Sequence, residues 1–182
     1  MIDVIDETTK EVRDEEFLEE DTQKDLYMTF VTAGESYAIA IRYVNEIISF
    51  QKITDIPDTE NYVKGLINLR GKIIPVIDVR IRFGYDSFEY TDRTCIIITE
   101  LKGYVVGLIV EKIEGVVSIP KEDILPPPEI GQLEGLADRY IYGIGKIEDD
   151  VKLMIDIDKL LKDPEDEEED NMPVEETEDE QE

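Results

Sequence analysis

Residues 62–80 read Tyr-Val-Lys-Gly-Leu-Ile-Asn-Leu-Arg-Gly-Lys-Ile-Ile-Pro-Val-Ile-Asp-Val-Arg, and this stretch decides the fold. Two runs rich in Ile, Val and Leu, Gly65–Leu69 and Lys72–Val79, are separated only by Arg70 and Gly71. Short apolar runs that flank a glycine-containing turn are typical of paired β-strands. We therefore predict two strands joined by a sharp turn at this point.

The same pattern extends outward on both sides of this hairpin. Ala33-Gly34-Glu35 and Lys102-Gly103 are further predicted hairpin turns, and short helices are predicted over residues 78–85 and 156–162. The other predicted strands cover residues 26–32, 36–41, 44–50, 94–101, 104–110, 115–119, 142–147 and 151–155. Many short strands with tight turns indicate an all-β protein built as small barrels or as a sandwich.

The chain also contains an internal repeat. A shift of 69 residues places residues 38–44 over residues 107–113, and a shift of 78 places residues 77–79 over residues 155–157. The second unit is longer because it carries a loop-like insertion from Pro126 to Arg139. A repeated strand-rich unit predicts two similar small barrels side by side.

Charge is concentrated at the two ends of the chain. The 182 residues carry a net charge of −27, of which residues 1–25 contribute −8, residues 162–182 contribute −12 and residues 26–161 only −7. Dense charge with little apolar surface to bury predicts segments that stay mobile. We therefore expect an acidic mobile arm over residues 1–25, a folded domain over residues 26–161 and a disordered acidic tail over residues 162–182.

The composition argues against several classes of function. An acidic surface repels polyphosphate, so we expect no direct nucleic-acid binding. The longest apolar runs, such as residues 95–98, are far shorter than the roughly 20 residues of a membrane helix, and the first residues show no secretory signal pattern. With Cys95 as its single cysteine, the chain has no internal disulfide. These features predict a cytoplasmic protein without direct membrane insertion.

The sequence contains few residues that could carry out catalysis or bind a metal ion. The chain has no histidine, which excludes His-based acid–base catalysis and His-containing metal sites. Asp156 with Asp158, or Asp149 with Asp150, could act as an acid–base pair or hold Mg²⁺. The structural interpretation is favoured, because Asp149-Asp150 suits a turn between strands and Asp156 suits a helix N-cap. Cys95 lies in an apolar run, which favours a buried thiol over a nucleophile. We therefore expect a protein that has no enzymatic activity and binds neither a cofactor nor a metal ion.

Residues 62–80 also resemble the signature of the CheW family of chemotaxis coupling proteins. That signature is a glycine, two apolar residues, Asn-Leu-Arg-Gly, and then a strand with an internal proline and a following Asp or Asn; here the glycine is Gly65 and the proline Pro75. Residues 41–48, 106–116 and 154–161 are similar to further segments of the family. The resemblance spans residues 26–161.

The resemblance implies two five-stranded SH3-like β-barrel subdomains packed around a shared core, with short helices and disordered acidic ends. It also implies a non-enzymatic adaptor that couples the regulatory domain of the histidine kinase CheA to the cytoplasmic tips of methyl-accepting chemoreceptors, in arrays at the membrane. Three alternatives stay open. They are an adaptor of a non-flagellar chemosensory pathway, a small acidic β-barrel that binds a ligand or metal, and a regulator whose acidic tail occupies a basic partner.

The kinase-binding surface of the family would fall on Met28, Ile41, Val44, Glu46 and Ile113. Apolar residues at an exposed barrel edge would supply the few desolvated anchors that a small interface needs. The alternative is that they are core residues, because alternation along a strand lets only some of them face outward.

The receptor-binding groove of the family would include Gly65, Asn68 and Arg70. Arg70 offers five donors in a rigid fork, which suits an acidic side chain of a receptor. Its alternative role is an internal salt bridge that ties one barrel to the other. Gly65 could instead be a position where a side chain would clash with the adjacent strand.

Overall fold

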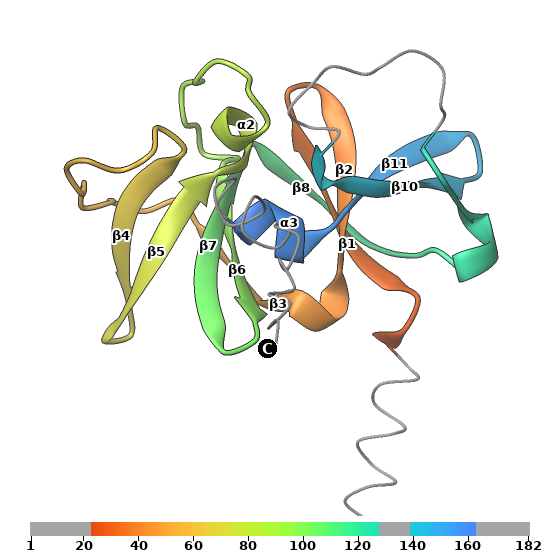
Figure 1. Cartoon of the computed structure of the whole chain (residues 1–182), viewed down its shortest axis with the longest axis horizontal. Helices are drawn as coiled ribbons and strands as arrows, with labels where there is room; N and C mark the ends of the chain where they lie inside the picture. Colours follow the sequence, from red (N-terminus) through yellow and green to blue (C-terminus); the bar gives the residue numbers. More distant parts are fainter. Residues whose placement is uncertain (1–22, 128–138, 163–182) are drawn as a thin grey trace, which may run out of the picture.

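The computed structural model describes residues 23–127 and 139–162, which form an all-β fold with a few short helical segments (Figure 1). The strands are β1 (Leu26–Thr32), β2 (Glu35–Ala40), β3 (Val44–Ser49), β4 (Val63–Leu69), β5 (Lys72–Asp78), β6 (Cys95–Leu101), β7 (Tyr104–Val110), β8 (Lys112–Ser118), β9 (Ile124–Leu125), β10 (Ile141–Ile147) and β11 (Asp150–Ile155). The helical segments are η1 (Ile41–Tyr43), α2 (Val79–Arg82), η2 (Lys121–Asp123) and α3 (Ile157–Leu161). Every predicted strand and both predicted helices are present. Nearly all of the predicted acidic arm, tail and proline-rich insertion lies outside the described residues.

The strands form two sheets, one for each barrel. The first barrel has the strand order β3-β6-β7-β5-β4, and the second has the order β8-β1-β2-β11-β10-β9. The chain beyond β3 returns to pair with β4, since Thr54 and Leu66 exchange two backbone hydrogen bonds of 2.9 Å. The chain beyond β8 likewise returns as β9 to pair with β10. In both sheets, therefore, the chain segment that follows β3 or β8 returns to pair with the next hairpin of the same sheet.

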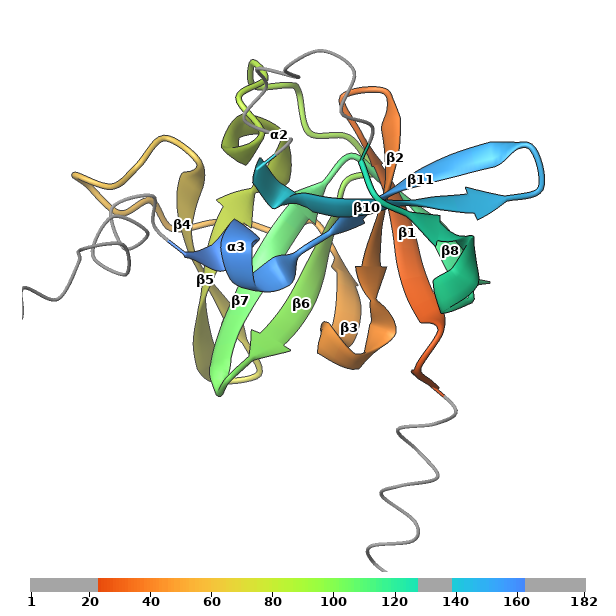
Figure 2. The ribbon, with the colours of Figure 1, turned by 45° about the vertical axis from the view of Figure 1, so that its right-hand side comes forward.

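The two repeats exchange strands between the barrels. The first barrel combines β3, β4 and β5 of the first repeat with the hairpin β6–β7 of the second, while the second barrel combines β8 to β11 with the hairpin β1–β2. The exchange is symmetrical, because β5 pairs in parallel with β7 just as β11 pairs in parallel with β2. The predicted repeat is confirmed, but each barrel contains strands from both copies instead of one copy alone. Figure 2 shows the two barrels joined through these exchanged strands.

Tight turns with two left-handed residues connect the two strands of the hairpins β1–β2, β4–β5 and β6–β7. The pairs Ala33-Gly34, Arg70-Gly71 and Lys102-Gly103 have φ values of 53° and 83°, 51° and 86°, and 52° and 84°. Two successive positive φ values are the mark of the type I′ turn, whose twist matches that of the flanking strands. These turns hold Arg70 and Lys102 at exposed hairpin tips.

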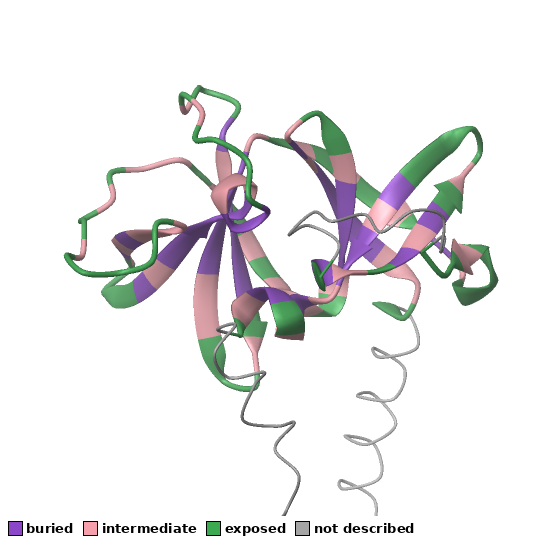
Figure 3. Ribbon diagram, turned by 45° about the horizontal axis from the view of Figure 1, so that its top comes forward, coloured by how far each residue is buried: buried purple, intermediate pink, exposed green. Residues whose placement is uncertain are grey.

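Over the part of the chain that the structure describes, three apolar clusters form the core, which appears as the purple interior in Figure 3. One belongs to the first barrel and is centred on Ile67, Val76 and Ile96; another belongs to the second and includes Ala38 and Met154. The largest lies between the barrels and contains residues of both, including Phe30, Tyr37, Phe83, Leu108, Tyr140 and Leu160. The core is thus shared, so neither barrel is an independent hydrophobic unit.

The short helices begin at equivalent aspartates. Asp78 caps α2 by accepting hydrogen bonds from the backbone N–H groups of residues 80 and 81, and Asp156 caps α3 by accepting from those of residues 158 and 159. Each aspartate N–H donates a 2.8 Å hydrogen bond to the carbonyl of an equivalent tyrosine, Tyr62 for Asp78 and Tyr140 for Asp156. The predicted N-cap role of Asp156 is confirmed.

A buried arginine joins the two barrels. Arg82 ends α2, is 5% exposed, and lies over the ring of Tyr62 at 4.2 Å and that of Tyr140 at 5.1 Å. Its guanidinium donates to the carbonyls of Leu160 and Lys162 at the end of α3. An arginine stacked between two rings is well placed to hold α3 against the first barrel.

Candidate functional site

Ile41 and Val44 lie where the chain crosses between the barrels. β2 belongs to the second barrel and β3 to the first, and η1 connects them. Both side chains are half-buried and pack against the shared core cluster. Val44 occupies the less exposed side of β3, whereas Asn45, Ile47 and Ser49 are exposed. Ile41 and Val44 are therefore partly core and partly surface. The Val44 side chain is less exposed than a residue at an exposed barrel edge would be.

Ile113 and Met28 have different surroundings. Ile113 is half-buried on β8 opposite Phe30, packs against the shared cluster, and is the repeat equivalent of Val44. Met28 is 6% exposed in the middle of β1 and belongs to the core. Met28 is therefore not part of an exposed barrel edge but lies beneath the surface, and its part in kinase binding stays a prediction.

Gly65 is also a core position. It is buried, has a φ of +132°, and a Cβ built on it would lie 2.1 Å from the carbonyl oxygen of Thr54. Thr54 is the residue that brings the chain beyond β3 onto β4. A side chain at position 65 would therefore push this strand contact apart, which supports the clash interpretation; the assignment of Gly65 to the receptor groove stays a prediction.

The turn between β4 and β5 presents Asn68 and Arg70 to solvent. The amide oxygen of Asn68 accepts a 2.9 Å hydrogen bond from the Gly71 N–H and so stabilises the turn. Arg70 extends from the tip to β3, where its Nη1 and Nη2 lie 2.7 and 2.8 Å from the two carboxylate oxygens of Glu46. This ion pair lies within the first barrel, so Arg70 does not tie one barrel to the other. The role between the barrels belongs to Arg82.

The ion pair controls the charge of Glu46. Hydrogen bonds from the Arg70 guanidinium lower the pKa of the Glu46 carboxyl, against the opposing effect of desolvation. Glu46 is therefore ionised at neutral pH and titrates below the ordinary range of a glutamate, and Arg70 and Glu46 present one paired unit at the surface. Two residues that the resemblance assigns to different partners are thus in direct contact.

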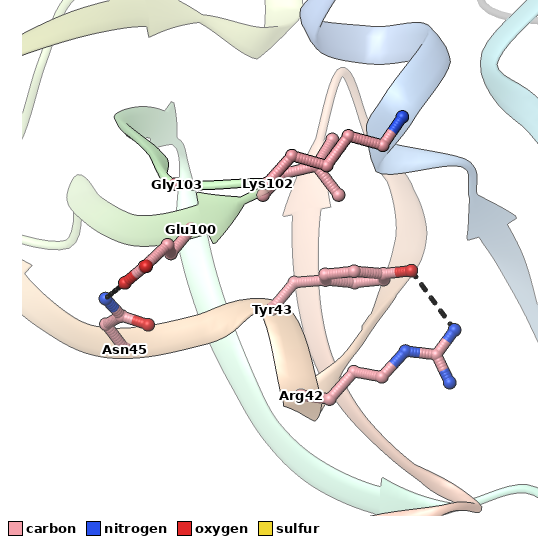
Figure 4. A pocket seen from close by; sticks show the side chains of 7 residues that line it. Arg42, Tyr43, Asn45, Glu100, Lys102 and Gly103 are labelled. Atoms are coloured by element: carbon pink, nitrogen blue, oxygen red, sulfur yellow. Dashed lines mark hydrogen bonds between the residues drawn. The ribbon is translucent and has the colours of Figure 1, made fainter.

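A polar hollow of about 350 Å³ lies beside these residues at the crossing between the barrels (Figure 4). Its lining residues are Arg42, Tyr43, Asn45, Glu100, Leu101, Lys102 and Gly103. Asn45 donates a 2.9 Å hydrogen bond to Glu100, and Arg42 donates a 3.1 Å hydrogen bond to the hydroxyl of Tyr43. The sequence interpretation missed this hollow, because η1 and the β6–β7 turn come from different repeats and meet only through the strand exchange.

The carboxylates and the cysteine considered above have structural surroundings. Asp156 caps α3, and Asp158 forms ion pairs of 2.5 Å with Lys102 and 3.0 Å with Lys162, which lower its pKa. Burial raises the pKa of the Cys95 thiol, the opposite of what activates a nucleophile. Within the described ranges, no group of three His, Cys, Asp or Glu side chains is arranged to hold a metal ion. Over the same ranges no helix is long and apolar enough to cross a membrane.

The strand exchange and the shared core define a module of two interlocked β-barrels. The chain belongs to the CheW family, whose CheW-like domain matches residues 26–165. It is 35% identical over 135 residues to the chemotaxis protein CheW of Klebsiella aerogenes, covering 74% of this chain and 80% of that protein. It is 37% identical over 134 residues to the Bacillus subtilis chemotaxis protein CheW, with coverage of 74% and 85%. The crystal structure of the scaffolding protein TtCheW from Thermoanaerobacter tengcongensis matches with a TM-score of 0.69 and 35% identity, over 77% of this chain and 94% of that one. The predicted family and fold are confirmed.

Proposed function

We propose that this chain is a chemotaxis coupling adaptor that binds a CheA-type histidine kinase and chemoreceptors at adjoining surfaces. Membership of a family of non-catalytic scaffold proteins makes it an adaptor and not an enzyme. We further propose that its two partners are the kinase and the chemoreceptors, and that the receptors recruit the chain to arrays at the membrane.

The observation that supports this proposal is the contact between Arg70 and Glu46. Arg70 stands on an exposed hairpin tip with its side chain 73% exposed, which suits it to reach a second protein. Glu46 lies on β3 two residues from Val44, which presents apolar surface at the crossing between the barrels. A charged, orientable side chain beside half-buried apolar residues is the composition of a small protein interface.

We assign Ile41, Val44, Glu46 and Ile113 to the kinase surface, and Asn68 and Arg70 to the receptor surface. Met28 and Gly65 contribute by holding these residues in place, since both are buried. Ile41, Val44 and Ile113 rest on one shared core cluster, so a single underlying structure supports the kinase surface.

The proposal is tested by isothermal titration of the full chain with a CheA regulatory domain and with a receptor signalling fragment. We expect binding to each partner alone, and a ternary complex when both are present. Titrations with divalent ions and nucleotides are the matched control, and we expect no heat of binding from either. A folded chain that binds neither protein but binds an ion would replace the adaptor with the acidic ligand-binding barrel.

A further inference from the structure

The two crossings between the barrels are equivalent in the repeat but are built differently. At the first crossing η1 separates β2 from β3, whereas at the second Glu111 alone separates β7 from β8. The 69-residue shift between the repeats places Glu111 over Arg42. It also places Ile113, which we assign to the kinase surface, over Val44. Ile113 therefore lies two residues beyond a crossing that consists of a single residue.

A β-bulge separates Ile113 from most of β8, which lies alongside β1 (Figure 2). Ile113 lies opposite Phe30. The next pair is Gly115 with Thr29, so Glu114 is an extra residue on β8. The start of β8, before the bulge, thus pairs with β1 through two residues only. Two pairs fix a strand register weakly, and a slip by one residue would turn the Ile113 side chain to the opposite face.

The carboxylate of Glu111 fixes the start of β8 on the side of the crossing. Its Oε1 accepts a 2.8 Å hydrogen bond from the Ala33 N–H in the β1–β2 turn and a 2.6 Å hydrogen bond from Nη1 of Arg80 on α2. The Glu111 and Arg80 side chains are 24% and 25% exposed, so solvent weakens this ion pair less than one at the open surface. One oxygen atom therefore joins a turn of the second barrel to the helix that follows β5 of the first.

Both donors to Glu111 have features that make this contact matter. Ala33 has a φ of 53°, a left-handed conformation that alanine adopts only at a cost in free energy, so an acceptor for its N–H helps to hold the turn. Arg80 also donates through Nε to the Asp86 carbonyl at 2.6 Å and lies over the ring of Phe88, 5.6 Å from its centre. The guanidinium is therefore held by contacts other than Glu111, and it positions the carboxylate.

A second carboxylate fixes the start of β8 on the side of the bulge. Oε2 of Glu114 accepts hydrogen bonds of 2.7 Å from Oγ of Ser36 on β2 and 3.1 Å from Nζ of Lys152 on β11. Lys152 is 8% exposed, so movement of Glu114 would leave a buried ammonium without its carboxylate. Gly115, with a φ of +150°, supplies a backbone conformation that L side chains rarely adopt. The bulge is therefore held at this place in the strand.

We propose that Glu111 and Glu114 are positioning residues that fix the register of the start of β8 and thereby place the Ile113 side chain on the kinase surface. The two carboxylates act from opposite sides of Ile113, and each is held by two elements other than β8. The placement of Ile113 for the kinase rests on the proposed function, whereas the effect on the strand register does not.

The effect on the register is tested in the full chain without any partner. NMR records the nuclear Overhauser effects (NOEs) between the side chains of Phe30 and Ile113, whose Cβ atoms should lie about 5 Å apart as a cross-strand pair. Glu111→Ala removes the acceptor of both donors and should abolish these NOEs. Those between Thr29 and Ala38, a pair of β1 and β2, should remain and show that the hairpin is folded.

Two further variants separate the hydrogen bonds of Glu111 from its charge. Glu111→Gln is the conservative variant, because its amide oxygen still accepts from Ala33 and Arg80, and the NOEs should be retained. Glu122→Ala removes an exposed acid on η2 and is the matched control, which should also retain them.

Two variants keep the test decisive if Glu111→Ala does not fold. Arg80→Met removes one donor and leaves the carboxylate in place, and Glu114→Ala acts from the side of the bulge. Each should weaken or abolish the NOEs between Phe30 and Ile113. Unchanged NOEs in every folded variant of these three would overturn the proposal.

Titration with the kinase regulatory domain then tests the consequence for binding. Glu111→Ala should weaken kinase affinity about tenfold or more, with receptor affinity nearly intact, and Glu111→Gln should bind the kinase like the unmodified chain. If the NOEs are lost and kinase affinity stays the same, the effect on the register stands and the placement of Ile113 for the kinase is refuted. If the unmodified chain binds no kinase at all, the proposed function fails while the NMR result keeps its meaning.

Discussion

Arg70 and Glu46 form a two-pronged ion pair that spans from the β4–β5 turn to β3, with N–O distances of 2.7 and 2.8 Å. The pair couples a residue assigned to the receptor surface with one assigned to the kinase surface. Because Arg70 holds both oxygens of Glu46, a partner that draws Arg70 away also frees the carboxylate. The two surfaces are thus chemically linked at a single contact.

The first prediction concerns the titration of Glu46. Arg70 lowers the pKa of this carboxyl below its ordinary value near 4.5, so the carboxylate and its ion pair are retained above that pH and lost as the pH falls through the lowered value. Carboxyl-detected NMR should show a midpoint below 4.5 that returns toward it in Arg70→Ala. Arg70→Lys, which keeps the charge but not the fork, should give an intermediate value. An identical midpoint in all three proteins would show that the pair does not persist in solution.

The second prediction concerns Gly65. In Gly65→Ala the new Cβ meets the Thr54 carbonyl at 2.1 Å in a backbone conformation that L-residues rarely adopt, so strain and overpacking add. We expect a loss of about 3 kcal/mol or more in the free energy of unfolding measured with urea. Gly34→Ala is the matched control, since it has a φ of +83° but open space around its Cβ. It should cost about 1 kcal/mol; equal losses would mean that the clash is relieved by movement of the Thr54 strand.

Local pattern made much of this fold predictable from sequence. Alternating Ile and Val runs with Gly turns identified the strands, and an aspartate before Lys159-Leu160-Leu161 identified the α3 cap. β9 was missed because it has only two residues and is defined by its pairing with β10 rather than by its own sequence. A repeat shows that two units are alike, but carries no information on which copy supplies each hairpin. The strand exchange was therefore not predictable from the repeat alone.

The candidate site was only partly predictable, for a similar reason. The motif identified the hairpin that carries Asn68 and Arg70. The ion-pair partner of Arg70, however, is Glu46, which lies 24 residues earlier in the chain on β3. Met28 and Val44 both occur in apolar strand runs, and only the tertiary packing shows that Met28 is buried whereas Val44 is half-buried. Arg82 resembles any surface arginine of a short helix, and its burial depends on two tyrosines brought together from different repeats.

The third prediction concerns the arginine between the barrels. Arg82→Met removes the stacking on Tyr62 and Tyr140 and leaves two carbonyls at the end of α3 without this donor. Cation–π contacts and charged hydrogen bonds at a buried site together indicate a loss of about 3 kcal/mol or more. Arg93→Met, at an exposed site, is the control and should change stability by less than about 0.5 kcal/mol. Urea unfolding measures both; similar small losses would show that shared apolar packing alone orients α3.

The fourth prediction concerns metal ions. Asp156 and Asp158 are engaged by helix N–H groups and by lysines, so neither needs a cation for neutralisation. Dialysis against a chelator should leave the melting temperature unchanged within error, and so should adding back Mg²⁺ or Ca²⁺. A shift of several degrees that depends on ion concentration would reveal a site that binds the folded state.

The fifth prediction concerns how the two partners divide the surface. Val44→Asp places a charge among half-buried apolar residues, and a change of about 3 kcal/mol in binding would weaken kinase affinity roughly a hundredfold. Because Val44 also packs on the shared core, this variant should lose stability as well, so Val44→Ala is needed beside it. Ile48→Ala is the matched control, since Ile48 is half-buried on the same strand but packs against the core of the first barrel.

Arg70→Ala completes the comparison. Its side chain is exposed and pairs within one barrel, so the melting temperature should change little, while receptor affinity falls and kinase affinity stays nearly intact. Circular dichroism and thermal melting first establish that each variant is folded, and titration against each isolated partner then assigns its role. Kinase loss in Val44→Ala but not in Ile48→Ala, at similar stability, would assign Val44 to the interface. Equal kinase affinity in both would make Val44 a core residue only. An equal loss of affinity for both partners in Arg70→Ala would show that the ion pair with Glu46, and not the arginine alone, organises the two surfaces.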